Sequence, residues 1–230
     1  MFLTLRHIGR YFSMLSQVFS RPEKGNVYWK KVIYEMHQIG LNSLAIVSII
    51  SIFMGAVVAI QTGLQLESPF IPKYLIGYAT RESLILEFSP TMIALILAGK
   101  VGSSIASEIG TMRVTEQIDA IRCLGADPVR KLVMPRVVAM TIIVPLLTVL
   151  ADIVGCMGGG LISMLQVDLT AQYVIRQMLE TIGPEDLIHG LMKSTFFGYW
   201  IAIVACWKGM NIRGGAESVG IATTETVVYT

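Results

Sequence analysis

Residues 99–121 read GKVGSSIASEIGTMRVTEQIDAI, and the character of the chain changes half-way along this stretch. The first half belongs to a long apolar run, in which a small residue recurs every four positions at Ala98, Gly102, Ala106 and Gly110. Small residues at this spacing let helices approach closely in a membrane. We therefore predict a membrane helix packed tightly on another helix, either in the same chain or in a second copy.

The second half of the stretch predicts a short polar helix outside the membrane. Thr115 is placed to cap its start, and Glu116 and Asp119 suit the positive end of a helix. Gly125 suits the position just after its end, before a new helix that Asp127 would cap. Apolar residues line one face and polar residues another, which leaves two interpretations: a docking site for a partner protein, or a solvated loop helix.

The composition indicates an integral membrane protein. The 230 residues are 53% hydrophobic and only 15% charged, whereas soluble domains carry about 25% charged residues. Four apolar segments, about 41–63, 84–106, 132–165 and 187–207, are long enough to cross a bilayer. Pro145 and the glycine cluster at 155–160 predict a kink or an irregular end in the third of these segments. We expect a fifth helix to begin near Val219 and to be incomplete in this chain.

Basic residues orient these segments. Residues 1–31 hold six Lys and Arg, the 107–136 connection five and the 208–218 connection two, whereas residues 64–83 and 166–186 together hold three, Arg81 among them. The positive-inside rule then places the N-terminus and the 107–136 connection in the cytoplasm. The net charge of +2 gives no support to a nucleic-acid partner.

The N-terminal residues 1–20 place apolar side chains at steps of three and four, with Arg6 and Arg10 on another face. This pattern favours a helix lying in the membrane interface, and the alternative is a helix packed on a partner.

Ionisable residues inside the apolar segments are candidate functional residues because charge is costly there. Glu87, beside Pro90, and Lys193 lie at a similar predicted depth. They would either brace two helices as an ion pair or contact the head group of an amphiphilic ligand. Lys100 is near enough to the cytoplasmic end to extend toward it, and Asp152 is left without a role.

Neither the three scattered histidines nor the three distant cysteines have metal-ligand spacing, and no phosphate-binding loop or catalytic constellation is present. An intramembrane lipid-modifying enzyme is therefore disfavoured. A secondary transporter or channel that uses its own charges stays open as the alternative function.

The central motif resembles the signature of the MlaE family of ABC-transporter permeases. The similarity continues through residues 125–136, and it includes GAVVAIQ at 55–61, EFSP at 87–90, LMKS at 191–194 and the segment 220–228, so it covers nearly the whole chain. Family members usually carry an arginine where this chain has Leu86, and they continue for about one more helix.

The resemblance implies an all-α integral membrane protein with a single permease domain over 1–230. It would comprise the interfacial helix, about five transmembrane helices with the last truncated, and a cytoplasmic coupling helix over 111–124. Such permeases are homodimers that work with cytoplasmic ABC ATPase subunits and a periplasmic MCE-domain lipid-binding protein. They lie in the inner membrane of Gram-negative bacteria and move phospholipids, which contributes to the lipid asymmetry of the outer membrane.

The resemblance also implies roles for particular residues. The chain would be non-catalytic and would hold no cofactor, because ATP and magnesium are bound by the ATPase. The lipid pocket lies at the dimer interface, with candidates Glu87, Lys193 and Gln61. The residues expected to contact the ATPase are Arg113, Thr115, Glu116, Gln117, Asp119 and Arg122.

Overall fold

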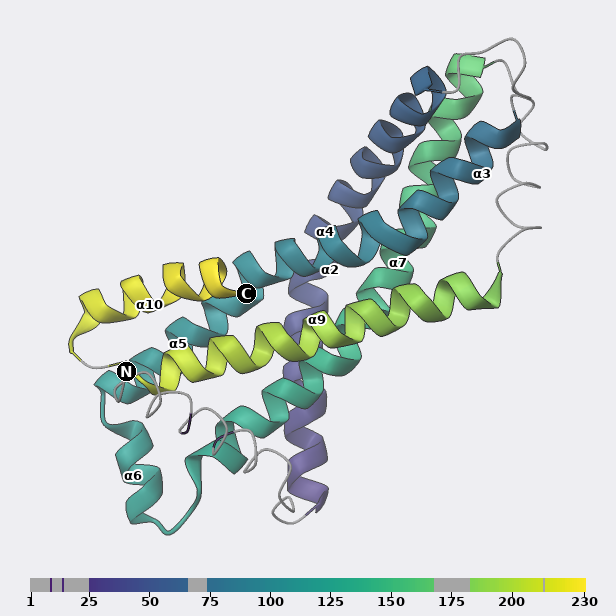
Figure 1. The fold of residues 1–230 in the computed structure, drawn as a ribbon. Coiled ribbons are helices and arrows are strands. Elements are labelled where there is room, and N and C mark those ends of the chain that lie inside the picture. The colour runs from purple at the N-terminus through teal and green to yellow at the C-terminus, as the bar shows by residue number, and fades with distance from the viewer. Residues whose placement is uncertain (1–8, 10–13, 15–24, 66–73, 168–182, 213) are drawn as a thin grey trace. The chain divides into compact units, whose positions relative to one another are not determined.

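All regular secondary structure in the described part of the chain is helical (Figure 1). The computed structural model describes Gly9, Met14 and residues 25–65, 74–167, 183–212 and 214–230. Its longest helices are α2 (Gly25–Gln65), α7 (Met134–Val167) and α9 (Pro184–Met210). The interfacial helix predicted for residues 1–20 lies outside the described residues, apart from Gly9 and Met14.

The helix that carries the central motif is continuous but contains two wider turns. Its segments are α3 (Tyr74–Ser83), the π-turn η1 (Leu84–Phe88), α4 (Ser89–Leu97), the π-turn η2 (Ala98–Gly102) and α5 (Ser103–Val114). In η1 the N–H of Ser89 bonds to the carbonyl of Leu84, five residues back. Pro90 follows directly and has no N–H, so the regular i to i−4 ladder cannot pass this point unbroken. π-Turns of this kind are frequent at functional sites.

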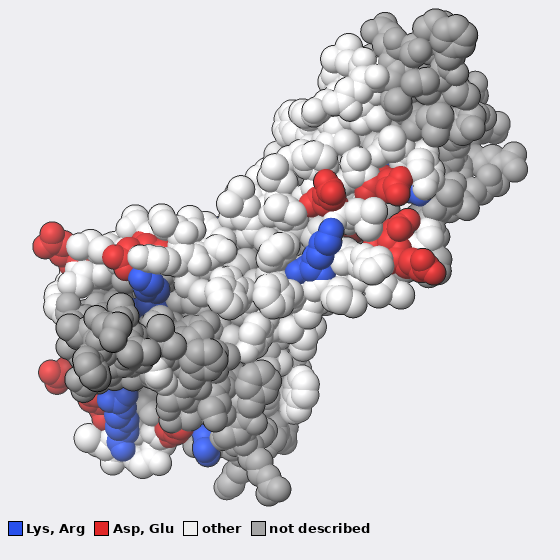
Figure 2. Space-filling model, viewed as in Figure 1, with Lys and Arg blue, Asp and Glu red and all other residues white. Residues whose placement is uncertain are grey.

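Four helical stretches are long and apolar enough to cross a membrane: Tyr28–Gln65, Gly77–Val114, Val129–Leu165 and Glu185–Met210. They contain the four segments predicted from hydropathy, so that prediction is confirmed. Large apolar side chains such as Phe53 and Leu165 are exposed on them. Figure 2 shows that most of the described surface facing the viewer carries no charged side chain. An apolar exterior of this kind suits a lipid environment.

The glycine cluster of the third segment does not end its helix, so the irregular end predicted there was wrong. After the π-turn η3 (Val129–Val133), α7 runs without interruption through Pro145 and through residues 155–160. A side chain at Gly158 would meet the backbone of Ile52, and one at Gly55 would collide with the carbonyl oxygen of Gly155. The glycines therefore let α2 and α7 pack backbone to backbone.

The chain divides into two compact units, whose boundaries fall within the long helices. The first comprises Met1–Ile39, Leu97–Ile143 and Gly198–Thr230, and the second comprises Gly40–Ile96 and Val144–Phe197. In the first unit α10 (Ala216–Tyr229) lies along α5 and buries Val219, Ala222 and Thr226 (Figure 1). This helix occupies the place where the sequence predicts the start of a fifth membrane helix.

Candidate functional site

The junction between α5 and the short helix α6 (Gln117–Cys123) is built by a sharp change of backbone direction. Glu116 adopts a left-handed conformation with φ of 60°, which is uncommon for a residue other than glycine. α6 therefore leaves the end of α5 at an angle and projects from the first unit (Figure 1). The predicted coupling segment 111–124 is thus two elements, because its first four residues belong to α5.

Thr115 does not cap α6, contrary to the sequence prediction. Its hydroxyl donates to the carbonyl of Thr111, at 2.8 Å, and so serves the end of the preceding helix. The residue before α6 is Glu116, whose side chain makes no capping hydrogen bond. The left-handed turn explains the difference, since it moves the start of α6 one residue beyond the position that propensity favours.

The far end of α6 follows the sequence prediction. Gly125 has φ of +76°, its N–H bonds to the carbonyl of Arg122, and the N–H of Ala126 bonds to the carbonyl of Ile121. This pair of bonds is a Schellman motif, which favours glycine at the left-handed position. Asp127 then accepts a hydrogen bond from the N–H of Val129 at 3.0 Å and caps the next helix.

α6 is anchored on one side and exposed on the other. Ile118 is fully buried, whereas Glu116 and Gln117 are exposed. Leu124, just beyond the helix, is 83% exposed, which is unusual for a leucine outside a lipid-facing span. A short helix with an exposed leucine beside polar residues can dock in a groove of a partner protein. The sequence pattern did not single out Leu124.

Asp119 and the two neighbouring arginines form an ion-pair cluster within the chain. The same carboxylate oxygen of Asp119 accepts hydrogen bonds from Arg113 at 2.8 Å and from Arg122 at 3.1 Å. Arg113 belongs to α5 and Arg122 to α6, so the cluster braces the angle between the two helices. Of the six residues expected to contact an ATPase, these three are therefore held by one another.

The small-residue face of the central helix makes its contacts inside the chain. Ala98 and Ala106 are buried, and a side chain at Gly102 would lie 3.3 Å from Ile201 of α9. A side chain at Gly110 would collide with Ile212. Of the two alternatives left open for this face, the structure shows packing within one chain on α9, α10 and the turn that joins them.

The candidate pocket residues Glu87 and Lys193 lie in the second unit. Lys193 donates through its Nζ to the carbonyl oxygen of Leu86, at 2.7 Å. In an α-helix that carbonyl would accept the N–H of residue 90, which is a proline and has none. The lysine thus supplies the donor that Pro90 lacks, next to Glu87. Glu87, Lys193 and Gln61 are all exposed on this unit.

A buried polar group in the second unit was not anticipated from the sequence. Arg81 is only 1% exposed and lies over the ring of Tyr78, at 5.0 Å from its centroid. The sequence assigns Arg81 to the 64–83 connection, and this assignment is wrong, because the helix begins at Tyr74, before the apolar run. Asp152 of α7 lies beside Ser89, and Cys156 is within electrostatic range of both Asp152 and Arg81. Ionisable side chains within candidate membrane spans usually pair with one another or mark a functional site.

No cluster of three or more His, Cys, Asp or Glu that could hold a metal ion occurs among the residues that the structure describes. The expectation that the partner ATPase binds ATP and magnesium is a separate matter and stays a prediction.

Known proteins resemble this chain over nearly its full length. The model of the family described as "Permease MlaE" matches residues 32–230. The chain belongs to the MlaE permease family. A "Probable ABC transporter permease protein" of Rickettsia prowazekii is 40% identical over 219 residues, which cover 94% of this chain and 82% of the relative.

Two more distant relatives of the permease show how widely the family extends. "Protein TRIGALACTOSYLDIACYLGLYCEROL 1, chloroplastic" of Arabidopsis thaliana is 32% identical, covering 92% of the permease and 60% of the relative. The "Intermembrane phospholipid transport system permease protein MlaE" of Haemophilus influenzae is 28% identical. The match covers 97% of this chain and 86% of the relative. The permease is thus a multi-pass membrane protein and a non-catalytic subunit of an ABC transporter.

Proposed function

We propose that this permease moves phospholipids between the inner membrane and a periplasmic MCE-protein route, as a homodimer driven by cytoplasmic ABC ATPase subunits. The observation that carries the proposal is α6, a short helix anchored by Ile118 that presents Glu116, Gln117 and Leu124 outward. The name of the Haemophilus relative, an intermembrane phospholipid transport system permease protein, supports phospholipid as the cargo.

In this mechanism α6 is the coupling helix. Nucleotide binding by the ATPase moves α6, and the Asp119 cluster transmits the motion to α5 because its ion pairs join both helices. α5 continues without a break into the helix that carries Glu87. The head group of the lipid would contact Glu87, Lys193 and Gln61, which are exposed polar residues of the second unit.

ATPase docking is tested by Glu116→Lys and Leu124→Asp, which change the two exposed elements of the α6 surface. We expect either substitution to reduce co-purification of the ATPase while membrane insertion is kept. Glu217→Lys, a charge reversal at another exposed glutamate of the same unit, is the matched control. Normal co-purification of both α6 variants would contradict the docking role.

Lipid contact is tested by Glu87→Lys in the assembled transporter. We expect it to reduce phospholipid transfer without reducing complex assembly, because only the charge presented to the head group changes. Glu185→Lys, at an exposed position near the start of α9, is the control. Transfer at the normal rate with Glu87→Lys would show that Glu87 is not a head-group contact.

A further inference from the structure

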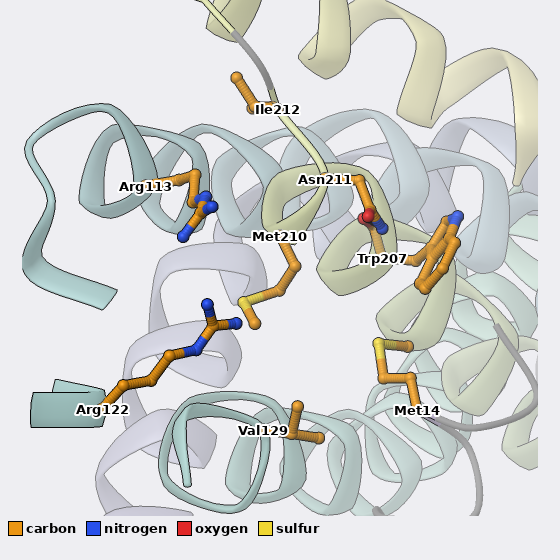
Figure 3. Close-up of a pocket in the computed structure, with 8 residues that line it drawn as sticks. All are labelled: Met14, Arg113, Arg122, Val129, Trp207, Met210, Asn211 and Ile212. Carbon is orange, nitrogen blue, oxygen red and sulfur yellow. Dashed lines mark hydrogen bonds between the residues drawn. The ribbon is translucent and has the colours of Figure 1, made fainter. Parts of the chain in front are cut away.

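A cavity of about 380 Å³ lies behind α6 in the first unit and is unrelated to the candidate lipid pocket. Arg113 and Arg122 point into it from α5 and α6, as Figure 3 shows. Its remaining walls include Trp207, Met210 and Ile212 from the end of α9 and the turn after it, together with Val129 from the start of η3.

The charge in this cavity is not balanced. Arg113 and Arg122 share a single carboxylate oxygen of Asp119, so two positive charges face one negative charge. Each guanidinium has five N–H donors, and the bonds to Asp119 occupy only the Nη1 atom of each. Among the described residues that line the cavity none is acidic.

A neighbouring cavity shows the contrast. It holds about 330 Å³ and is lined by Lys208 and Glu225, which pair with each other at 2.7 Å. Lys208 also lies 3.9 Å from the centroid of the Tyr229 ring. The cation of that cavity is thus neutralised within the chain, whereas the described residues leave an excess positive charge in the arginine cavity.

The position of the arginine cavity selects the kind of anion. Trp207 and Met210 lie in the last turn of a candidate membrane span. Tryptophan is enriched where such spans meet the bilayer surface. Phosphate groups of lipids lie at the same depth. Paired arginines bind phosphate oxygens through parallel hydrogen bonds, and the apolar walls suit the glycerol and upper acyl carbons of a lipid.

We infer that this cavity binds the phosphate group of an anionic phospholipid, held by Arg113 and Arg122 behind the α5–α6 junction. The bound lipid would stabilise the angle between these helices, because its phosphate would take up the donors that Asp119 leaves free. This inference goes beyond transport, since the lipid here is a resident ligand and not the cargo.

The cavity contains its own fluorescent reporter. The chain has three tryptophans, and Trp29 and Trp200 lie elsewhere with exposed rings. In a Trp29→Phe, Trp200→Phe background, emission reports Trp207 alone. The purified full chain in a neutral detergent is titrated with dihexanoylphosphatidylglycerol, dihexanoylphosphatidylcholine and inorganic phosphate. We expect saturable binding of the phosphatidylglycerol, about tenfold tighter than that of the zwitterionic lipid.

The titration with inorganic phosphate distinguishes two possible ligands that both present phosphate oxygens: a lipid head group and a free phosphate ion. Weak or absent binding of phosphate beside tight binding of phosphatidylglycerol identifies a lipid head group as the ligand. Equal or tighter binding of phosphate would overturn the lipid assignment and leave a site for a free phosphate ion. If neither phosphatidylglycerol nor inorganic phosphate gives a saturable change in Trp207 emission, the inferred site itself is overturned.

Substitutions connect binding to the arginines. Arg113→Gln and Arg122→Gln should each weaken phosphatidylglycerol binding about tenfold, through loss of charge-assisted hydrogen bonds. Arg130→Gln is the matched control, since Arg130 is an arginine of the same connection that pairs with Asp127 outside the cavity. An equal loss with Arg130→Gln would show general charge attraction and contradict the site.

Asp119→Asn distinguishes binding from bracing. Removal of the shared carboxylate charge leaves two uncompensated guanidiniums. Phosphatidylglycerol should therefore bind the Asp119→Asn variant more tightly than it binds the unsubstituted chain. Weaker binding would show that the cluster only holds the helices together. These measurements need no ATPase, so a failed docking or transport test of the proposed function leaves their outcome unaffected.

Discussion

At the scale of single residues, Lys193 has a role that hydropathy alone does not suggest. Its ammonium group reaches the carbonyl of Leu86 across the second unit. That carbonyl lacks its usual donor because residue 90 is proline. A backbone carbonyl without a partner is costly in lipid, which explains why a cation is tolerated here.

We predict that Lys193→Met destabilises the permease, because the Leu86 carbonyl then loses its donor. The cost should be about 1 kcal/mol, measured by thermal unfolding in detergent. Lys193→Arg should recover most of the stability, since a guanidinium can also donate to the carbonyl. Lys30→Met, which removes an exposed lysine, controls for the loss of charge. Equal stability of the Met variant and the unsubstituted chain would contradict the capping role.

At the same scale, Arg136 is a buried cation whose partners come from two other helices. Its side chain is 3% exposed, and it pairs with Glu35 of α2 at 3.3 Å and with Glu108 of α5 at 2.6 Å. Removal of one member of a buried pair leaves an uncompensated charge. The arginine therefore joins α2, α5 and α7 in the first unit.

We predict that Arg136→Met destabilises the first unit by about 3 kcal/mol. Glu108→Gln should cost less, because Glu108 is 54% exposed and water can replace its partner. Lys131→Met, at an exposed position five residues earlier on the same helical stretch, is the control. The free energy of unfolding of the three variants is measured by chemical denaturation. Similar stability of Arg136→Met and Lys131→Met would show that the ion pairs of Arg136 do not stabilise the first unit.

At the scale of the elements, glycine contacts set how closely α2 and α7 approach in the second unit. Gly55 faces the carbonyl of Gly155, and Gly158 and Gly159 face the backbone of α2. Close approach of this kind depends on the absence of a side chain on both helices. The contact is rigid because backbone atoms cannot turn aside as a flexible side chain can.

Gly55→Ala is therefore expected to push the two helices apart and to lower the thermal stability of the permease. Gly99→Ala should have little effect, since nothing lies within 4 Å of the methyl group it would add. Unfolding midpoints in the same detergent provide the measurement. If the two variants unfold at the same temperature, the close contact of α2 and α7 does not limit stability.

At the scale of the whole molecule, the distribution of basic residues predicts that α6 faces the cytoplasm. Cys123 at the end of α6 is exposed, whereas Cys156 is half-buried and Cys206 is buried. In a Cys156→Ala, Cys206→Ala background, a membrane-impermeant maleimide should label Cys123 in inverted membrane vesicles. Right-side-out vesicles should stay unlabelled until they are permeabilised. Labelling of intact right-side-out vesicles would reverse the predicted topology.

The sequence by itself determined the membrane class, the four spans and the end of α6. These follow from local rules: about 20 apolar residues cross a bilayer, and a left-handed position favours glycine, as at Gly125. The family is likewise readable from the central motif. The approximate place of the short polar helix also follows from composition, because polar residues leave the membrane wherever they gather.

Only the tertiary structure decided which residues meet. The glycine cluster at 155–160, where the sequence predicts a kink or an irregular end, packs against the backbone of α2. Arg81, which the sequence assigns to a connection, is buried. The tertiary structure joined Lys193 to the Leu86 carbonyl and placed Arg113 and Arg122 around one carboxylate beside a cavity. Such pairings depend on how distant helices cross, and a one-dimensional pattern of hydropathy and charge does not specify those crossings.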